Sequence, residues 1–356
     1  MVNALPAKVC EDHVVIGDSK EASQVHNRGW FGTPQPGGSL RLELVEALFL
    51  VESGRLEVLS DNGAVGFEGL MKRAISLQAG FEIRYLVYAD LKQRGFTVKP
   101  FLPPPPDFAV YERGTIPSRA RSKYHVMALS ERASFDLEEL RRTAERAVSV
   151  GKALMLALVD EEGDLTYYEL DVIEPKGVMQ GGLPTARGRG VVLEERVLVF
   201  EKEIADGLRR SHYGRPAGKA LQLSLLEAVF LEESGILELQ AAKTGQPVSR
   251  TALLRKAHSS QPDFDLRLRA YRDLRRRGLV VRTGFKYGTH FRLYDTDPEN
   301  SHARFLLHAV PKGYTSTWPE VSRAVRLAHG VRKEMLLARV ASRDDIVYLK
   351  LGRSRP

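Results

Sequence analysis

The chain has 356 residues, with 53 Lys and Arg against 45 Asp and Glu, and its formal net charge is +8. Its 43% hydrophobic and 28% charged residues give a globular composition that excludes disordered and fibrous classes, and the length suits two domains. No apolar run approaches the roughly 18–20 residues that cross a bilayer, and the first residues lack the pattern of a secretory signal, so we expect neither. Cys10 is the single cysteine, which excludes an internal disulfide and favours the reducing cytoplasm.

The chain contains an internal repeat. Residues 40–58, LRLELVEALFLVESGRLEV, return at 221–239 as LQLSLLEAVFLEESGILEL, at an offset of 181. Residues 81–98 return at 264–281 at an offset of 183, and residues 151–159 return at 332–340 at an offset of 181. Three matches at nearly one offset indicate a duplicated unit.

Each copy is predicted to be α+β, helical first and mixed afterwards. Leu44, Ala47, Leu48 and Val51 have the spacing of an apolar helix face, which ends at Gly54, and the same pattern recurs before Gly235. In the second copy a helix is predicted over 264–277, strands over 279–282, 291–294 and 305–310, a helix near 319–331, and strands over 335–340 and 346–351. In the first copy, residues 101–107 (FLPPPPD) predict a rigid turn or polyproline segment instead.

These patterns predict a two-repeat chain. Residues 1–172 form the first repeat, residues 173–190, rich in glycine and proline, form a linker, and residues 191–356 form the second repeat. In each repeat a helical and mixed N-terminal subdomain precedes a mixed α/β, nuclease-like subdomain, which in the second repeat covers about residues 279–356.

The charge is unevenly distributed. Ten basic residues lie between Arg250 and Arg282, against three acids, which fits either a solvated helix face or a phosphate-binding surface. The histidines of the second half have no zinc-ligand spacing, and no paired Asp-x-Asp accompanies them, so no metal site is expected. The glycine-rich segment 181–190 lacks the Gly-Lys-Ser/Thr of a phosphate loop, so no nucleotide cofactor is expected either.

Three polar residues of the second copy stand at strand and helix ends: Tyr294 closing FRLY, His302 in NSHARF, and Lys333 in GVRKEMLLA. In the segment GFKYGTHFRLY, in the histidine just ahead of a strand, and in VRLAHGVRKEMLLA, the sequence resembles the archaeal tRNA-splicing endonuclease family, also called tRNA-intron lyase. The resemblance runs from about residue 40 to the end of the chain. It implies that Tyr294, His302 and Lys333 act together at a scissile phosphate, without a metal.

The implied reaction is attack of a ribose 2′-hydroxyl on its neighbouring phosphate, which leaves a 2′,3′-cyclic phosphate and a 5′-hydroxyl. An unperturbed histidine has a pKa of about 6.5 and can act as general acid, which is the role expected of His302. An unperturbed tyrosine has a pKa near 10, so Tyr294 would act as base only beside cations. Lys333 supplies one such cation and is expected to stabilise the phosphorane.

The first copy is predicted to be inactive. Tyr294 and Lys333 correspond there to Tyr111 and Lys152, but His302 corresponds to Arg121, which cannot donate a proton near neutral pH. One active centre per chain is therefore expected.

The resemblance also implies a substrate and an assembly. The substrate is precursor tRNA with a bulge–helix–bulge, whose unstacked bases can be gripped by guanidinium stacking from Arg326 and Arg353. The chain is expected to be a homodimer in which an acidic turn of the inactive copy (Asp160, Glu161, Glu162 and Asp164) enters a basic cleft of the partner chain. The alternative reading is a non-catalytic subunit that binds RNA or scaffolds an RNA-processing complex. A metal-dependent nuclease is disfavoured because clustered carboxylates are missing near the motifs of the second copy.

Overall fold

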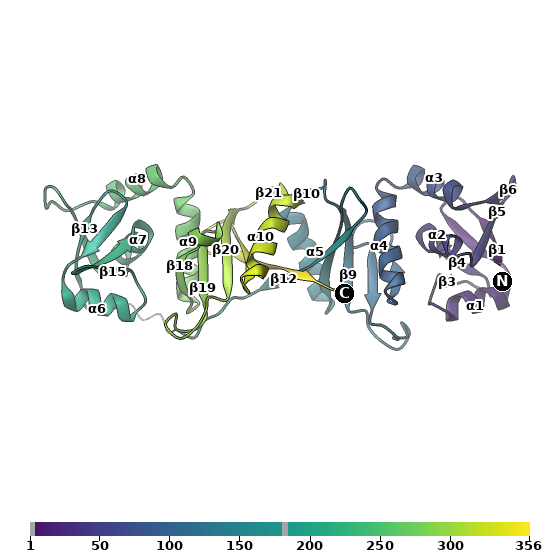
Figure 1. Ribbon diagram of the computed structural model, residues 1–356, viewed down its shortest axis with the longest axis horizontal. Coiled ribbons are helices and arrows are strands. Elements are labelled where there is room, and N and C mark those ends of the chain that lie inside the picture. The colour runs from purple at the N-terminus through teal and green to yellow at the C-terminus, as the bar shows by residue number, and fades with distance from the viewer. Residues whose placement is uncertain (1–3, 180–183) are drawn as a thin grey trace. The chain divides into compact units, whose positions relative to one another are not determined.

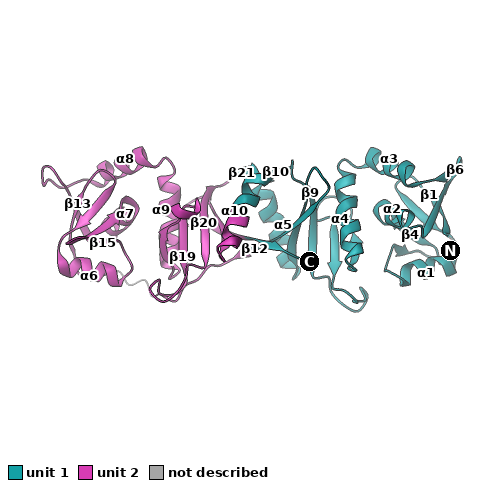
Figure 2. Ribbon diagram, viewed as in Figure 1, with its two compact units in different colours: residues 1–171, 315–323, 351–356 teal, residues 172–314, 324–350 magenta. Residues whose placement is uncertain are grey.

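The computed structural model describes residues 4–179 and 184–356 (Figure 1). Its contacts divide the chain into two compact units, which Figure 2 colours separately. Unit 1 comprises Met1–Asp171, Thr315–Arg323 and Leu351–Pro356, and unit 2 comprises Val172–Tyr314 and Ala324–Lys350. Each unit therefore holds one copy of the repeat, except that unit 1 also takes two short segments from the second copy. Within the described residues, no helix is long and apolar enough to cross a membrane.

Unit 1 contains two main sheets with helices packed on them. The first sheet has the strand order β3-β4-β2-β1-β5-β6, and the second has the order β12-β11-β9-β8-β7. The strands are β1 (Leu5–Val9), β2 (His13–Ile16), β3 (Thr33–Pro34), β4 (Leu40–Glu43), β5 (Leu56–Ser60), β6 (Gly63–Val65), β7 (Thr97–Pro100), β8 (Phe108–Tyr111), β9 (Tyr124–Ser130), β10 (Ser134–Asp136), β11 (Ala153–Val159), β12 (Leu165–Ile173) and β21 (Thr315–Thr317). The helices are α1 (Ser19–Asn27), α2 (Leu44–Glu52), α3 (Phe67–Leu77), α4 (Phe81–Gln93) and α5 (Leu137–Ser149).

Unit 2 repeats this plan. Its first sheet has the order β15-β16-β14-β13-β17, and its second contains β18-β19-β20-β22-β23. The strands are β13 (Gly188–Val192), β14 (Arg196–Val199), β15 (Arg215–Ala217), β16 (Ala220–Ser224), β17 (Leu237–Ala241), β18 (Val280–Thr283), β19 (Phe291–Tyr294), β20 (Phe305–Pro311), β22 (Glu334–Val340) and β23 (Ile346–Ser354). The helices are α6 (Lys202–Arg210), α7 (Leu225–Glu233), α8 (Arg250–Ser260), α9 (Phe264–Arg276), the 3₁₀ turn η1 (Phe285–Tyr287) and α10 (Trp318–Gly330), whose residues from Ala324 onward belong to unit 2.

The α+β prediction is confirmed, and the predicted helix faces are α2 and α7. Both helices begin with a capping box, in which Glu46 or Glu227 at the third helical position reaches back to the N-cap backbone. The same carboxylates accept from the backbone N–H groups of Gly32 and Gly214 at 2.8 and 2.9 Å. A buried glutamate thus ties each helix to the preceding loop. Burial raises the pKa of Glu46, and its hydrogen bonds from backbone N–H groups offset part of that effect.

Each copy opens with a sheet, which differs from the expected helical start. The first strand of each sheet pairs antiparallel with the next strand and parallel with the strand that follows the capped helix: β1 with β2 and β5, and β13 with β14 and β17. The capped helix packs on this sheet, and its apolar residues form the centre of each core, with Leu48 and Val229 fully buried.

The predicted linker over 173–190 remains a prediction, and its residues 180–183 lie outside the described residues. At its ends the structure places Ile173 in β12 and Gly188–Gly190 in β13. Gly188 and Gly190 face Ile204 and Val197 so closely that an added Cβ would lie 2.5 and 2.7 Å from those side chains. Glycine at these positions therefore lets β13 approach the core, in addition to any role as a flexible joint.

Candidate active site

The catalytic candidates of the second copy lie at one edge of the second sheet of unit 2. In the register, Leu293 of β19 is opposite Phe305 of β20, and Phe305 is opposite Glu334 of β22. Tyr294 directly follows Leu293, and Lys333 directly precedes Glu334. Because β19 runs antiparallel to β20 while β22 runs parallel to it, the end of β19 and the starts of β20 and β22 meet at the same edge. Sheet topology therefore brings together residues that are 39 positions apart in the sequence.

Tyr294 is anchored in a small apolar cluster. It is only 8% exposed and packs with Val280, its cross-strand partner, and with Ala303. The guanidinium carbon of Arg292, two residues earlier on the same strand, lies 5.8 Å from the centroid of the tyrosine ring. Alternate residues of a strand share a face, so this cation stands beside the ring.

Lys333 lies in the turn that joins α10 to β22. The helix ends at Gly330, Arg332 adopts a positive φ of 56°, and the N–H of Lys333 donates to the carbonyl of Ala328 at 2.8 Å. The ammonium lies 5.7 Å from the centroid of the Tyr287 ring and 3.4 Å from the carbonyl oxygen of Val331. These contacts hold the half-buried lysine at the sheet edge.

His302 lies exposed in the loop between β19 and β20. Asp297 organises this loop: its carboxylate accepts from the N–H of Glu299 at 2.9 Å, and its carbonyl accepts from the Ser301 hydroxyl at 2.7 Å. The neighbouring Ala303 is buried, so the backbone on either side of the histidine is fixed while the imidazole faces solvent. A side chain placed in this way is available to a substrate at the sheet edge.

The first copy has the same edge with a different side chain. Val110 of β8 is opposite Tyr124 of β9, and Tyr124 is opposite Ala153 of β11, so Tyr111 and Lys152 take the corresponding positions. The Lys152 ammonium donates to the carbonyl of Ser122 at 2.5 Å. Arg121 is exposed in the loop where the second copy has its histidine.

The structure also places the other predicted site residues. Arg326 is exposed on α10 in unit 2, whereas Arg353 is exposed near the end of β23 and belongs to unit 1. Within unit 1, Arg353 lines a cavity whose wall includes the carboxylates of Glu52, Asp90 and Asp160. Because the two arginines belong to different units, their joint role in RNA binding stays a prediction.

The acidic turn (Asp160, Glu161, Glu162 and Asp164) joins β11 to β12. The Asp160 carboxylate accepts from the N–H groups of Glu162 and Asp164 at 3.0 and 2.9 Å, which closes the turn. Its four carboxylates are exposed. Glu161 pairs with Arg132 at 2.5 Å, in an ion pair so exposed that it contributes little to stability.

Unit 2 contains a cavity whose lining residues the sequence analysis did not name. It has a volume of about 260 Å³, and we call it the arginine-lined cavity because Arg196, Arg215, Arg267, Arg282 and Arg292 contribute to its wall. Glu195 and Glu227 are the carboxylates in that wall, so positive charge prevails. Only Arg267 and Arg282 belong to the basic segment noted in the sequence, because the other three arginines lie on separate strands or loops.

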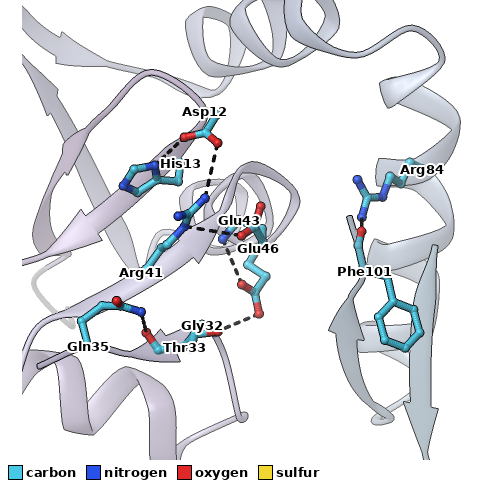
Figure 3. Close-up of polar contacts among 10 residues, drawn as sticks. All are labelled: Asp12, His13, Gly32, Thr33, Gln35, Arg41, Glu43, Glu46, Arg84 and Phe101. Carbon is cyan, nitrogen blue, oxygen red and sulfur yellow. Dashed lines mark hydrogen bonds and ion pairs between the residues drawn. The ribbon is translucent and has the colours of Figure 1, made fainter. Parts of the chain in front are cut away.

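The corresponding region of the first copy has its charges paired. Figure 3 shows Arg41 between Asp12 and Glu43, at 3.3 and 3.6 Å, with Glu46 bound to the backbone of Gly32 and Glu43. The hydrogen bond from His13 is the main reason why the pKa of Asp12 is lowered, and Arg41 adds to it. The two copies therefore share a backbone plan here but differ in charge.

The residues that the structure describes include no group of three or more His, Cys, Asp or Glu side chains that could hold a metal ion. Near the sheet edge where Tyr294 and Lys333 lie, the charged neighbours of Arg304 are Asp295 and Glu334, at 3.6 and 3.7 Å. The polar groups at this edge are therefore a phenol, an imidazole, an ammonium, and a guanidinium with two carboxylates beside it.

Comparisons with known proteins give a consistent result. The family model described as the tRNA intron endonuclease catalytic C-terminal domain matches residues 81–167 and 264–348, and the model described as the N-terminal domain matches 6–71 and 188–254. The chain is 37% identical over 353 residues to the tRNA-splicing endonuclease of Methanococcoides burtonii, covering 98% of this chain and 99% of that protein. The tRNA-splicing endonucleases of Methanosarcina mazei and Halobacterium salinarum are 37% and 33% identical, with coverage of 96% or more on both sides.

Proposed function

Because the chain belongs to the family of tRNA-splicing endonucleases, enzymes of tRNA intron excision, we propose that it cuts precursor tRNA at a bulge–helix–bulge without a metal ion. The proposed products have 2′,3′-cyclic phosphate and 5′-hydroxyl ends. The observation that carries the proposal is the meeting of Tyr294, Lys333 and the His302 loop at one sheet edge in the second copy.

In the proposed reaction, Tyr294 as phenolate takes the proton of the ribose 2′-hydroxyl while the 2′-oxygen attacks the adjacent phosphorus. The bond between phosphorus and the 5′-oxygen breaks, and His302 as imidazolium gives its proton to that leaving oxygen. The new bond between the 2′-oxygen and phosphorus closes the cyclic phosphate. Lys333 stabilises the negative charge on the non-bridging oxygens of the phosphorane.

The surroundings of each side chain suit these roles. Arg292 stands beside the ring of Tyr294, and Val280 and Ala303 pack against that ring. The exposed imidazole of His302 can reach a phosphodiester in solution, and the anchored backbone on each side limits its motion. In the first copy Arg121 stands at the position of the acid, and we propose that this copy is inactive.

For substrate binding, we propose that a bulge base stacks between the guanidinium planes of Arg326 and Arg353 from the two chains of a homodimer. A flat guanidinium group can stack on the face of an unstacked base. Bases inside a duplex are stacked on each other and leave no face free. The proposal is consistent with the solvent exposure of both side chains.

For the homodimer itself, we propose that the acidic turn of one chain enters the arginine-lined cavity of the other. The exposed carboxylates of the turn and the five arginines of the cavity have opposite charges. Arg292, whose buried Nε has no hydrogen-bond partner among the described residues, contributes to the positive charge of this wall. We also propose that the protein is cytoplasmic. Its single cysteine excludes an internal disulfide and fits a reducing compartment.

The test is cleavage of a bulge–helix–bulge RNA in excess EDTA, with analysis of the product ends. We expect cyclic phosphate, and we expect His302→Ala to slow single-turnover cleavage roughly 10²–10⁴-fold while RNA affinity stays nearly unchanged. Arg121→Ala is the matched control and should cleave at the normal rate. Equal losses in both variants would show that the active copy is misassigned, and a loss of all cleavage in EDTA would contradict the metal-free mechanism.

A further inference from the structure

An exposed aromatic ring stands on the turn beside Lys333. Phe285 is 86% exposed, and no other large apolar side chain that the structure describes is exposed to that extent. It opens the 3₁₀ turn η1, followed by the exposed Lys286 and the half-buried Tyr287. Exposure of so large an apolar side chain costs free energy in water, and its surroundings decide whether it marks an interaction surface.

Hydrogen bonds and two glycines fix the backbone of the turn that carries the exposed ring. The N–H of Tyr287 donates to the carbonyl of Gly284 at 2.8 Å, and the N–H of Gly288 donates to the carbonyl of Phe285 at 3.0 Å. Gly288 takes a left-handed φ of 62°, which suits glycine. An added Cβ on Gly284 would lie 2.2 Å from the hydroxyl oxygen of Thr289, so this residue must be glycine for the turn to close.

The turn borders the catalytic edge. The ammonium of Lys333 lies 5.7 Å from the ring centroid of Tyr287, two residues from Phe285. Lys286 lies in the same turn as Phe285, and Arg332 lies in the turn that carries Lys333. Both side chains are exposed. An exposed aromatic ring among cations suits a polyanion that carries flat apolar groups, because the cations attract phosphates and the ring stacks on bases.

We propose that Phe285 is a stacking platform for an unpaired base of the RNA substrate, next to the phosphate that is cut. The inference rests on the proposed function and adds a positioning residue to it. Phe285 holds the nucleotide, and the chemistry stays with Tyr294, His302 and Lys333. Each base has a flat face, so the platform selects an unstacked base without reading its identity.

The first copy offers a matched control. At the offset of 183, Phe285, Lys286 and Tyr287 correspond to Leu102, Pro103 and Pro104, so the aromatic and cationic residues occur in the active copy alone. Leu102 is also exposed, at 67%, on the connection between β7 and β8. A substitution there removes a similar exposed apolar side chain without touching the catalytic edge.

The experiment pairs Phe285→Leu with base removal. Bulge–helix–bulge RNAs are made intact and with an abasic site at each bulge position in turn, and dissociation constants and single-turnover rates are measured. Loss of one stacked base is worth roughly 5- to 150-fold in affinity, so Phe285→Leu should bind intact RNA that much more weakly. One abasic RNA should bind the wild type and Phe285→Leu equally well. Phe285→Trp should retain full affinity, as should Leu102→Ala.

Several outcomes would overturn the proposal. One is that Phe285→Leu binds intact RNA as tightly as the wild type does. Another is that Phe285→Leu binds every abasic RNA more weakly than the wild type does, by the same factor. A sedimentation shift of Phe285→Leu from dimer to monomer would assign the ring to a protein interface instead. Failure of the proposed function gives a different result, because the wild type would then not release cyclic phosphate from intact RNA.

Discussion

His290 should make unit 2 sensitive to mild acid. The imidazole is 18% exposed, its Nδ1 accepts from the N–H of Ala309 at 3.1 Å, and its Nε2 lies 3.2 Å from Asp263. Both contacts suit the neutral ring, whose Nε2–H donates to the carboxylate. Burial, with help from Arg267 and His308, lowers the pKa of His290 to about 4.

The direction of the pH dependence follows from the pKa of His290 in the unfolded and in the folded chain. The unfolded chain binds a proton at His290 with a pKa of about 6.5, whereas the folded chain resists it until about pH 4. Stability that is present above pH 6.5 is therefore lost as the pH falls toward 4. A difference of about 2.5 pKa units corresponds to about 3 kcal/mol, from 1.36 kcal/mol per unit. Burial also lowers the pKa of His308, whose ring centroid lies 4.9 Å away, so it acts in the same direction.

Hydrogen exchange of the segment 285–311, corrected for intrinsic rates, measures this loss at pH 7 and pH 4.5. The wild type should lose most of the expected 3 kcal/mol of protection, about two orders of magnitude in the exchange equilibrium. His290→Gln keeps an acceptor and a donor but cannot titrate, so its protection should fall much less. His329→Gln, at an exposed histidine, should lose protection as the wild type does. If His290→Gln lost as much protection as the wild type, another group would be the cause.

Three further predictions concern assembly, substrate and folding. Replacing the four acids of the acidic turn by serine should weaken the dimer in sedimentation, and added salt should do so more modestly; a dimer of full strength would leave the turn as solvated surface. Arg326→Lys should weaken binding of bulged RNA roughly 5- to 100-fold and leave plain duplex RNA unaffected, because lysine keeps the charge but not the stacking plane; equal loss on both RNAs would make it a phosphate contact. Gly284→Ala should cost about 1–3 kcal/mol in urea unfolding because its Cβ meets Thr289, whereas Gly17→Ala, with open space around it, should cost little.

The sequence predicted the second half of each copy better than the first. The helix at 264–277 and the strands at 291–294 and 305–310 match α9, β19 and β20 within a residue or two at each end. Glycines after the helices and long apolar stretches make these boundaries readable. The opening sheets were missed, although β4 and β5 alternate buried and exposed residues, because strands of four or five residues give a short period-2 signal beside a strong helix pattern.

The pairing of β10 with β21 was outside the reach of sequence patterns. Phe135 is opposite Ser316 in an antiparallel pair, although 181 positions separate them. That separation equals the repeat offset, so the two strands are corresponding segments of the two copies. Trp318 is buried against Phe135, with ring centroids 5.0 Å apart. Local periodicity describes one strand at a time, and each of these has only three residues, so their partnership depends on tertiary packing.

Part of the candidate site was predicted from the sequence, and the rest is visible only in the structure. Tyr294, His302 and Lys333 were predicted from their motif context, and the strand register puts the backbone of Tyr294 and that of Lys333 at the same edge of the sheet. The arginine-lined cavity has no sequence signal, because Arg196, Arg215 and Arg292 are isolated arginines whose convergence depends on the packing of two sheets. Phe285 was present in the recognised segment GFKYGTHFRLY, yet only its exposure distinguishes it from an ordinary core aromatic.

The two copies keep the residues that have structural contacts and differ at a position that has none among the described residues. Tyr111 and Lys152 have structural contacts, since Tyr111 is opposite Thr97 in the sheet and the Lys152 ammonium caps the carbonyl of Ser122. His302 and Arg121 are exposed in loops whose anchoring residues are their neighbours, so exchanging one for the other costs the fold little. If His302 is the general acid of a single active centre, as we propose, it is the member of the proposed trio whose loss costs the fold least. The tyrosine and lysine of the first copy can remain for packing alone.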